Sequence, residues 1–216
     1  KGSWLSIWLK ALGANITGYS LPPPTKPSLF ELVNVSDDMQ SIEGDIRDLD
    51  HMNAVLQKNS PEILIHMAAQ PLVVKSHEDP HDTYTTNVLG TLNVLEALRH
   101  SNSIKAAIII TSDKCYQNKE WVWGYREKDR LGGDDPYSSS KACAELITSA
   151  YRHSYFKKPQ FPFKDVSLAT ARAGNVIGGG DWSTKRLIPD CIRALRKNTP
   201  INLRNPNFNR PWQFVM

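Results

Sequence analysis

A tyrosine and a lysine lie four residues apart in the segment Tyr137-Ser-Ser-Ser-Lys141. On a helix, residues four apart share one face, so the phenol and the ammonium would lie side by side. A nearby ammonium favours the phenolate and lowers the pKa of a tyrosine. Tyr137 would then be a base near neutral pH, suited to taking a hydroxyl proton while hydride leaves the same carbon. Lys141 could also hold a ribose. The spacing is common by chance, so its context decides what it means.

Four polar residues, Thr111 to Lys114, directly follow the apolar run Ala106–Ile110. Ligands of parallel sheets bind at the carboxyl ends of the strands, where these residues would lie. A helix cap would need one polar residue here, not four. With Ser112 at a strand end, 25 residues before Tyr137, the Tyr-x-x-x-Lys spacing becomes a strong indication of hydride chemistry. The alternative for Lys114 is an ordinary surface lysine.

Two other strand ends carry candidate ligand-binding residues. The carboxylate of Asp45, next to Ile46, could accept a hydrogen bond from an adenine amine, or it could cap a helix beginning at Arg47. The small residues of Ala68-Ala-Gln70 follow an apolar strand at 62–66. They would let a ligand approach the backbone, or would serve tight packing of a helix on the sheet.

The elements that must position these residues alternate along the chain, as is typical of a doubly wound α/β sheet. A nucleotide-binding fold of this kind begins with a strand and a glycine turn before its first helix. This sequence begins on the helix, with Gly2 at the end of the turn. Polar and glycine-rich loops are expected at 115–135 and 174–180. We predict helices at 4–12, 47–58, 82–99, 136–155 and 188–197, and strands at 15–19, 40–43, 62–66, 106–110, 166–171, 201–203 and 212–215.

Composition sets the broad class. The chain has 216 residues, of which 40% are hydrophobic and 22% charged, and this excludes a disordered protein. No apolar run approaches the roughly 18 residues of a membrane span. Because the sequence begins with Lys1 and ends at Met216 after an apolar run, we expect it to be part of a longer protein. Expressed alone, it is expected to be poorly stable and inactive.

The formal net charge of +4 is concentrated near the C-terminus, where residues 185–212 hold seven basic residues and one acid. Nucleic acid is one possible partner of such a segment, but no zinc finger, zipper or aromatic RNA motif accompanies it. A compact anion such as a nucleotide diphosphate would need only two or three of these groups. Alternatively, Arg193, Arg196 and Lys197 form a solvated helix face.

The cysteines and histidines do not suggest a disulfide framework or a metal site. The three cysteines lie far apart and include no Cys-x-x-Cys, which fits a reducing cytoplasm. His77 and His81 have the spacing of zinc ligands on a helix, but Pro80 lies between them and the accompanying glutamate is missing.

Taken together, these segments resemble the extended short-chain dehydrogenase/reductase superfamily, which uses Tyr-x-x-x-Lys with an upstream Ser or Thr and NAD(P). Within it, the chain resembles the sugar-nucleotide 4,6-dehydratases that act on CDP-glucose. Those enzymes place Asp-Lys where this chain has Asp113-Lys114, whereas the dTDP-glucose enzymes typically place Asp-Glu. The resemblance rests on the segments 1–5, 44–48, 66–71, 87–91, 111–116, 137–141, 172–182, 186–190 and 210–213.

The resemblance implies a doubly wound, Rossmann-like parallel sheet with part of a smaller C-terminal substrate-binding lobe. Residues 1–171 would form an NAD-binding domain lacking its first strand, and residues 172–216 the start of the nucleotide-sugar lobe. The implied catalytic residues are Ser112, Asp113, Lys114, Tyr137 and Lys141. NAD would be held by Gly2, Asp45, Ile46, Ala68, Ala69, Gln70, Asn87 and Thr111 together with Tyr137 and Lys141. The nucleotide sugar would be held by Asn175, Arg186, Leu187, Ile188, Arg204, Arg210 and Trp212, with no metal.

The implied reaction has three stages. In the first, Tyr137 deprotonates the sugar O4 as hydride leaves C4. In the second, Lys114 removes the C5 proton while Asp113 protonates the departing C6 hydroxyl. In the third, hydride returns to C6. The product would be CDP-4-keto-6-deoxyglucose, for lipopolysaccharide O-antigen synthesis. The resemblance also implies a cytoplasmic homodimer formed through the helices at 82–99 and 137–155, with neither nucleic acid nor membrane as a partner. The alternatives are a 4-epimerase, a dehydratase of another nucleotide hexose, or an inactive remnant. Asp113-Lys114 argues against the epimerase, which needs no acid and base for elimination.

Overall fold

The computed structural model describes residues 1–156 and 165–216. Packing divides them into two compact units, one formed by Gly44–Ala173 and the other by Lys1–Glu43 together with Gly174–Met216. The break after Ala173 lies close to the predicted domain boundary at 171, but residues 1–43 group with the C-terminal segment. The predicted division into an NAD-binding domain and a substrate lobe concerns function and stays a prediction.

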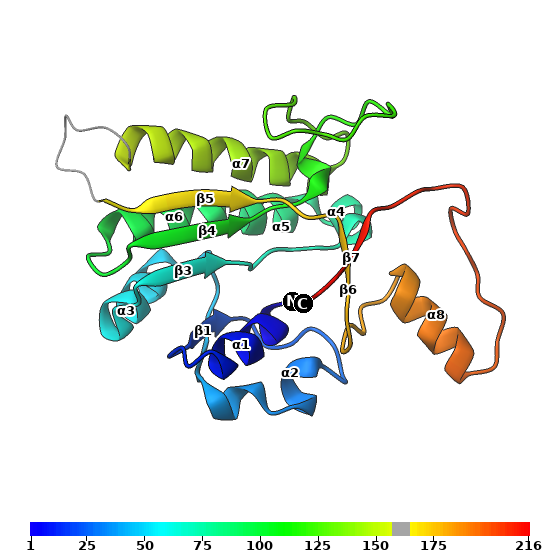
Figure 1. The fold of residues 1–216 in the computed structure, drawn as a ribbon, viewed down its shortest axis with the longest axis horizontal. Helices are drawn as coiled ribbons and strands as arrows, with labels where there is room; N and C mark the ends of the chain where they lie inside the picture. Colours follow the sequence, from blue (N-terminus) through cyan, green and yellow to red (C-terminus); the bar gives the residue numbers. More distant parts are fainter. Residues whose placement is uncertain (157–164) are drawn as a thin grey trace. The chain divides into compact units, whose positions relative to one another are not determined.

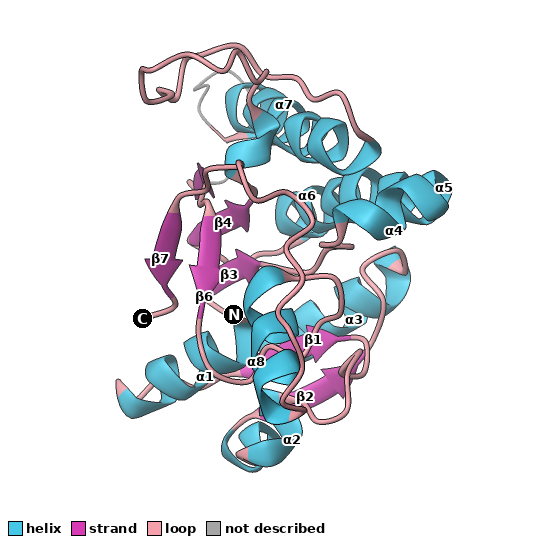
Figure 2. Cartoon of the chain, turned by 90° about the vertical axis from the view of Figure 1, so that its right-hand side faces the viewer, coloured by secondary structure: helices cyan, strands magenta, loops and turns pink. Residues whose placement is uncertain are grey.

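A three-stranded parallel sheet forms the middle of the unit 44–173. Its strands are β3 (Ile63–His66), β4 (Ala106–Ile110) and β5 (Ser167–Ala171), in the order β3-β4-β5. Four helices lie on one side of this sheet (Figure 2): α4 (Val73–Glu78), α5 (Pro80–Tyr84), α6 (Gly90–His100) and α7 (Pro136–Tyr155). Accordingly Ala107 and Ile109 are buried, whereas Ile108 is 37% exposed. The apolar run at 106–110 is confirmed as a strand, and one of its faces is more fully covered than the other.

Two helices of this unit, labelled α3 and α7 in Figure 1, begin after acidic cap residues. Helix α3 (Leu49–Asn59) begins after Asp48, whose carboxylate accepts from the His51 N–H at 2.9 Å. Helix α7 (Pro136–Tyr155) begins after Asp135, which accepts from the Ser138 N–H at 2.9 Å. Pro136 stands at the first helical position, where a missing N–H costs nothing. The predicted alternative of Asp45 as a helix cap is therefore wrong.

The predicted single helix at 82–99 consists of three parts. Helix α5 (Pro80–Tyr84) continues through a π-helical turn, η2 (Thr85–Leu89), into α6 (Gly90–His100). A side chain at position 90 would meet the Ile46 side chain at 2.5 Å, so glycine permits the close approach of Ile46. A short helix that we did not predict, α4 (Val73–Glu78), precedes this segment. None of the helices in the described ranges is long and apolar enough to cross a membrane.

The second unit contains two small parallel sheets. Strand β1 (Thr17–Ser20) pairs with β2 (Gln40–Glu43), and β6 (Asn175–Ile177) pairs with β7 (Trp212–Phe214). Its helical elements are α1 (Gly2–Ala11), α2 (Leu29–Leu32), η1 (Val35–Asp38) and α8 (Leu187–Arg196).

Two sequence predictions for the second unit are wrong. The segment 174–180, predicted as a loop, contains β6, and the predicted strand at 201–203 is irregular. Side chains at Gly174 and Gly178 would come within 2.7 and 2.5 Å of Pro211 and Val215, so these glycines allow the distant strand to pair. Local sequence does not reveal that pairing.

Candidate active site

The segment after β4 forms a tight turn. Ser112 opens a 3-10 helix, η3 (Asp113–Cys115), and its Oγ accepts from the Lys114 N–H at 3.2 Å. The same hydroxyl donates to Asp113 Oδ1 at 2.9 Å. Helix α7 packs against this turn. The structure thus brings three of the predicted catalytic residues onto one turn, beside the helix that carries the other two.

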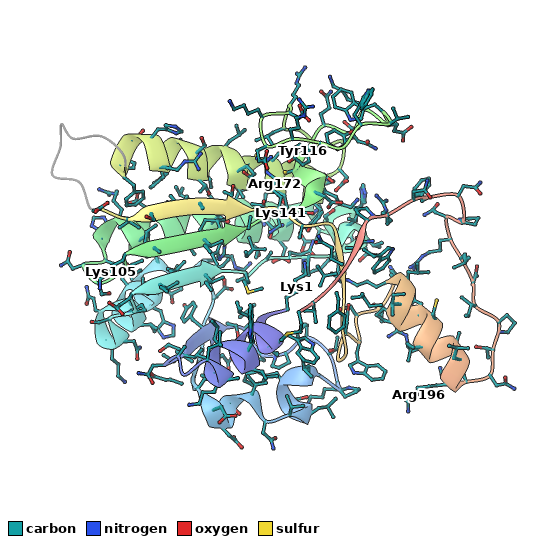
Figure 3. The ribbon with its side chains drawn as sticks, viewed as in Figure 1. Lys1, Lys105, Tyr116, Lys141, Arg172 and Arg196 are labelled. Carbon is teal, nitrogen blue, oxygen red and sulfur yellow. The ribbon has the colours of Figure 1, made fainter. Side chains whose placement is uncertain are left out.

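Three functional groups lie at four-residue intervals along α7. Tyr137 and Lys141 are followed by Glu145, so all three fall on one side of the helix. Lys141 is only 7% exposed and Glu145 only 4%. Figure 3 shows Lys141 at the end of the sheet where β4 and β5 terminate. The sequence predicted Tyr137 and Lys141 as site residues. Glu145 was missed, although its spacing from Lys141 repeats that between Tyr137 and Lys141.

Glu145 holds the ends of β4 and β5 through four hydrogen bonds. Its Oε1 accepts from Thr111 Oγ1 at 2.5 Å and from Arg172 Nε at 2.9 Å. Its Oε2 accepts from Thr170 Oγ1 at 2.9 Å and from Arg172 Nη2 at 2.8 Å. Burial would raise the pKa of Glu145, but the hydrogen bonds from Arg172 and the two threonines outweigh it, so the pKa lies below its ordinary value. The carboxylate is therefore ionised and fully paired.

Asn87, in the π-helical turn, connects three segments. Its Oδ1 accepts from the Gln70 N–H at 2.8 Å, and its Nδ2 donates to the Gln70 carbonyl at 3.1 Å and to Ser140 Oγ at 2.9 Å. Ser140 in turn donates to the Tyr137 carbonyl at 2.7 Å. The predicted role of Asn87 was cofactor binding. The structure shows that it ties the loop after β3 to the first turns of α7, in a type of turn that is frequent at functional sites.

His66, the last residue of β3, is buried as a neutral imidazole. Burial, and secondarily the charge of Lys141, lowers the pKa of His66 to about 3 from its ordinary 6.5. Its Nε2 lies 3.1 Å from Thr91 Oγ1, which donates its own proton to the Asn87 carbonyl at 2.7 Å. Thr91 therefore accepts, which assigns the imidazole proton to Nε2.

Protonation of His66 should weaken the fold in mild acid. Because its pKa is depressed in the folded state, its contribution to stability is present above pH 6.5 and is lost as the pH falls toward 3. His66→Gln keeps an N–H for Thr91. The substitution should reduce the pH dependence of the free energy of unfolding by up to about 1.4 kcal/mol per pH unit. Urea unfolding of the full-length protein at several pH values measures the effect. His153→Gln, at an exposed position of α7, is the control. Parallel parent and His66→Gln profiles would contradict the assignment.

Asp45, the predicted adenine-binding residue, is half-buried, and its neighbour Ile46 is buried. Both oxygens of Asp45 accept from the Arg47 guanidinium, at 2.5 to 3.0 Å, which lowers the pKa of Asp45. An open hollow, lined by residues 45 and 47–50, lies at this point. The Ile46 carbonyl accepts from Asn93 Nδ2 at 3.1 Å and its side chain packs beside Gly90. Ile46 thus has a packing role, and cofactor contact at Asp45 and Ile46 stays a prediction.

The predicted substrate-binding residues belong to the other unit. Asn175 and Trp212 lie opposite each other in the β6–β7 pair. The arginines have separate partners: Arg186 lies 3.6 Å from Asp181, Arg204 lies 3.1 Å from Asp190, and Arg210 lies over the Phe208 ring. Leu187 and Ile188 begin α8. Gly2, which was predicted to bind the cofactor, also belongs to this unit, and a side chain there would meet nothing within 4 Å. The structure brings only the first two of these residues into register, and the binding roles stay predictions.

Comparison with known proteins identifies one family. The family described as GDP-mannose 4,6 dehydratase matches residues 25–215. A CDP-glucose 4,6-dehydratase from Salmonella typhimurium is 54% identical over 216 residues, which are the whole of this chain and 60% of that protein. The chain thus spans less than two thirds of that relative.

Solved structures show the same fold. The UDP-glucose 4-epimerase from Thermotoga maritima with UDP-glucose matches with a TM-score of 0.85 at 19% identity, covering 99% of this chain and 66% of that one. A dTDP-glucose 4,6-dehydratase from Bacillus anthracis in complex with NAD matches with a TM-score of 0.80 at 22% identity, covering 99% and 64%. The predicted Rossmann-like α/β fold is confirmed.

Proposed function

Because the chain belongs to the GDP-mannose 4,6 dehydratase family, we propose that its protein is an NAD-dependent 4,6-dehydratase acting on CDP-glucose. The observation that carries this proposal is the Ser112-Asp113-Lys114 turn packed against the helix of Tyr137 and Lys141. An acid and a base besides Tyr137 are what water elimination requires and epimerisation does not. The 54% identical relative named as a CDP-glucose 4,6-dehydratase supports the choice of nucleotide.

Tyr137 takes the proton of the sugar O4 during oxidation at C4. Lys141, one helical turn away and nearly buried, stabilises the phenolate that this step needs. Ser112 sits at the start of the neighbouring turn, where its hydroxyl is held by Asp113. On substrate binding the hydroxyl turns to the sugar O4 and fixes its orientation.

Asp113 and Lys114 carry out the elimination. The C4 ketone makes the C5 proton acidic, and Lys114 removes it as a base and returns a proton to C5 once hydride has been added at C6. Asp113 donates a proton to the C6 hydroxyl, which leaves as water. The two side chains follow each other in one short 3-10 turn, which suits a base and an acid that act on the neighbouring carbons C5 and C6 of one sugar.

NAD fits the residues at the edge of this unit. When bound, it supplies the acceptor and later the donor of the hydride. Ala68 and Ala69 form irregular backbone after β3 with no bulky side chain, and Gln70 is fixed by Asn87. These residues, with Thr111, Lys141 and the hollow at Asp45, would hold the cofactor.

The arginine-rich second unit would hold the nucleotide diphosphate, since guanidinium groups suit bidentate pyrophosphate contact. We also propose a cytoplasmic homodimer, formed through the outer faces of α6 and α7 and through the turn η2, which precedes α6. Leu89 and Leu146 are 52% and 57% exposed on these elements. Sedimentation of the full-length protein as a monomer would contradict the dimer. The 4-keto-6-deoxy product would serve lipopolysaccharide O-antigen synthesis.

An assay of the full-length protein with four glucose nucleotides tests the proposed function. We expect CDP-glucose to give a 4-keto-6-deoxy sugar, with kcat/KM at least roughly tenfold above that for the dTDP-, UDP- and GDP-linked sugars, a difference of about 1.4 kcal/mol. Mass spectrometry of the product distinguishes dehydration from epimerisation, since only dehydration removes a water. An epimer as the product, or preference for another nucleotide, would refute the corresponding part of the proposal.

A further inference from the structure

The pair of buried Glu145 and half-buried Arg172 joins the parts of the candidate site without belonging to the predicted catalytic groups. Glu145 lies on α7, two helical turns beyond Tyr137, and a helix is rigid over that distance. Its hydrogen-bond donors lie at the carboxyl ends of β4 and β5: Thr111 precedes Ser112 directly, and Arg172 follows β5. The carboxylate therefore fixes how far α7 can slide along the strand that ends in the Ser112–Lys114 turn.

Arg172 continues the connection outward, into the loop Gln117–Arg130. Its Nη1 donates to the Glu127 carbonyl at 3.1 Å, and its guanidinium lies 4.8 Å from the centre of the Tyr116 ring. Figure 3 shows the Arg172 and Tyr116 labels close together at this end of the sheet. The Tyr116 ring stacks on Tyr125 at 4.9 Å, and Tyr125 lies 5.5 Å from Trp121. A continuous stack thus runs from the ion pair to the loop.

The ion pair is better suited to fixing a position than to stabilising the fold. Removing two charges from water costs nearly as much as their attraction returns, so apolar side chains of equal size often stabilise a fold as well. Two parallel N–H···O bonds to a carboxylate do add a strict geometry, which apolar contacts lack. Both carboxylate oxygens of Glu145 accept hydrogen bonds from Arg172 and the two threonines, so the position of the carboxylate relative to β4 and β5 is fixed.

We infer that Glu145 and Arg172 are positioning residues, which set the Ser112–Lys114 turn and the loop Gln117–Arg130 against Tyr137 and Lys141. This inference rests on the proposed function. A displacement of about 1 Å between reacting groups lowers turnover on the order of 100-fold. Loss of the pair therefore lowers kcat with little change in KM, because the second unit, with the predicted nucleotide-binding arginines, is untouched.

The test uses the full-length protein with the double substitution Glu145→Gln and Arg172→Met. This variant removes both charges together and keeps an acceptor for Thr111, so neither charge is left buried alone. We expect kcat with CDP-glucose to fall about 100-fold while KM stays within about 3-fold. The kcat of Arg172→Lys, which keeps the charge but loses the paired geometry, should fall roughly tenfold. This variant tests the positioning role if the double variant does not fold.

A second measurement does not depend on activity. Trypsin has cleavage sites in the loop at Lys119, Arg126, Lys128 and Arg130. If the pair holds the loop, cleavage there becomes at least roughly tenfold faster in the double variant. Glu96→Gln is the matched control, because Glu96 also pairs with an arginine, Arg99, and accepts from Tyr151 of α7. The control should keep the parental kcat and loop cleavage.

The outcomes separate the two proposals. Parental kcat or parental loop cleavage in the substituted proteins would overturn the positioning role. Failure of the parent protein to convert CDP-glucose would refute the proposed function alone, since trypsin cleavage would still report whether the pair holds the loop.

Discussion

Tyr137→Phe in the full-length protein is expected to lower kcat with CDP-glucose roughly 10³-fold, within the range that general acid–base groups contribute. Phenylalanine keeps the ring but cannot accept the O4 proton, so oxidation at C4 stops at the first step. The helix should form as before, since α7 begins from Asp135 and Pro136 rather than from the Tyr137 hydroxyl. Steady-state kinetics and a thermal unfolding scan measure the two effects separately.

Tyr84→Phe is the matched control for this substitution. The Tyr84 hydroxyl also contacts α7, lying 2.6 Å from Ser139 Oγ, but it belongs to α5 and has no predicted part in the chemistry. We expect Tyr84→Phe to keep turnover within about 2-fold, since exposed hydrogen bonds contribute little. If Tyr137→Phe retained near-parental kcat, the assignment of Tyr137 as the base would be wrong.

Lys114→Ala is expected to separate oxidation from elimination. Without an amine at this position the C5 proton stays in place, so formation of the 4-keto-6-deoxy product falls about 10²- to 10⁴-fold. Oxidation at C4, which depends on Tyr137 and Ser112, should continue. Accumulation of reduced nicotinamide, together with loss of deuterium incorporation at C5 in heavy water, measures this separation.

Lys105→Ala controls for the loss of a lysine at the other end of the same strand. Lys105 precedes β4 and pairs with Glu62 at the surface. This exposed ion pair contributes little to the fold, so the variant should retain full dehydration. If Lys114→Ala dehydrated the substrate as fast as the parent protein, Lys114 would be excluded as the C5 base. The same conclusion would follow if the variant lost C4 oxidation together with dehydration.

Elements with local signals were predicted well. Strand β4 and helix α7 begin and end where the sequence indicated, because an apolar run and the Asp135-Pro136 start define them without reference to distant residues. The bounds of β2 were also predicted correctly. Strand β6 was missed because its glycines make room for a partner strand 37 residues away, Asn175 pairing with Trp212. The π-helical turn was missed because its residues keep helical spacing on either side.

The site divides in the same way. Ser112, Asp113 and Lys114 follow one strand, and Tyr137 and Lys141 share one helix, so local spacing was enough to single them out. The roles of Asp113 and Lys114 in elimination came from the family resemblance. Glu145 was also within reach of that reasoning, four residues beyond Lys141, but its partner Arg172 lies after another strand. Only the parallel pairing of β4 with β5 brings Thr111 and Arg172 to the same carboxylate.

The π-helical turn at Thr85–Leu89 also fixes the length of the chain in this region. Each residue of an α-helix turns the chain by about 100°. Deleting one residue from the turn would convert it to regular α-helix. If Asn87 then kept its contacts with Gln70 and Ser140, the following helix would rotate its buried side chains, Val94, Leu95 and Leu98, out of the core. If these side chains stayed in the core, Asn87 would face away from Gln70 and Ser140. This segment therefore does not tolerate the loss or gain of a single residue.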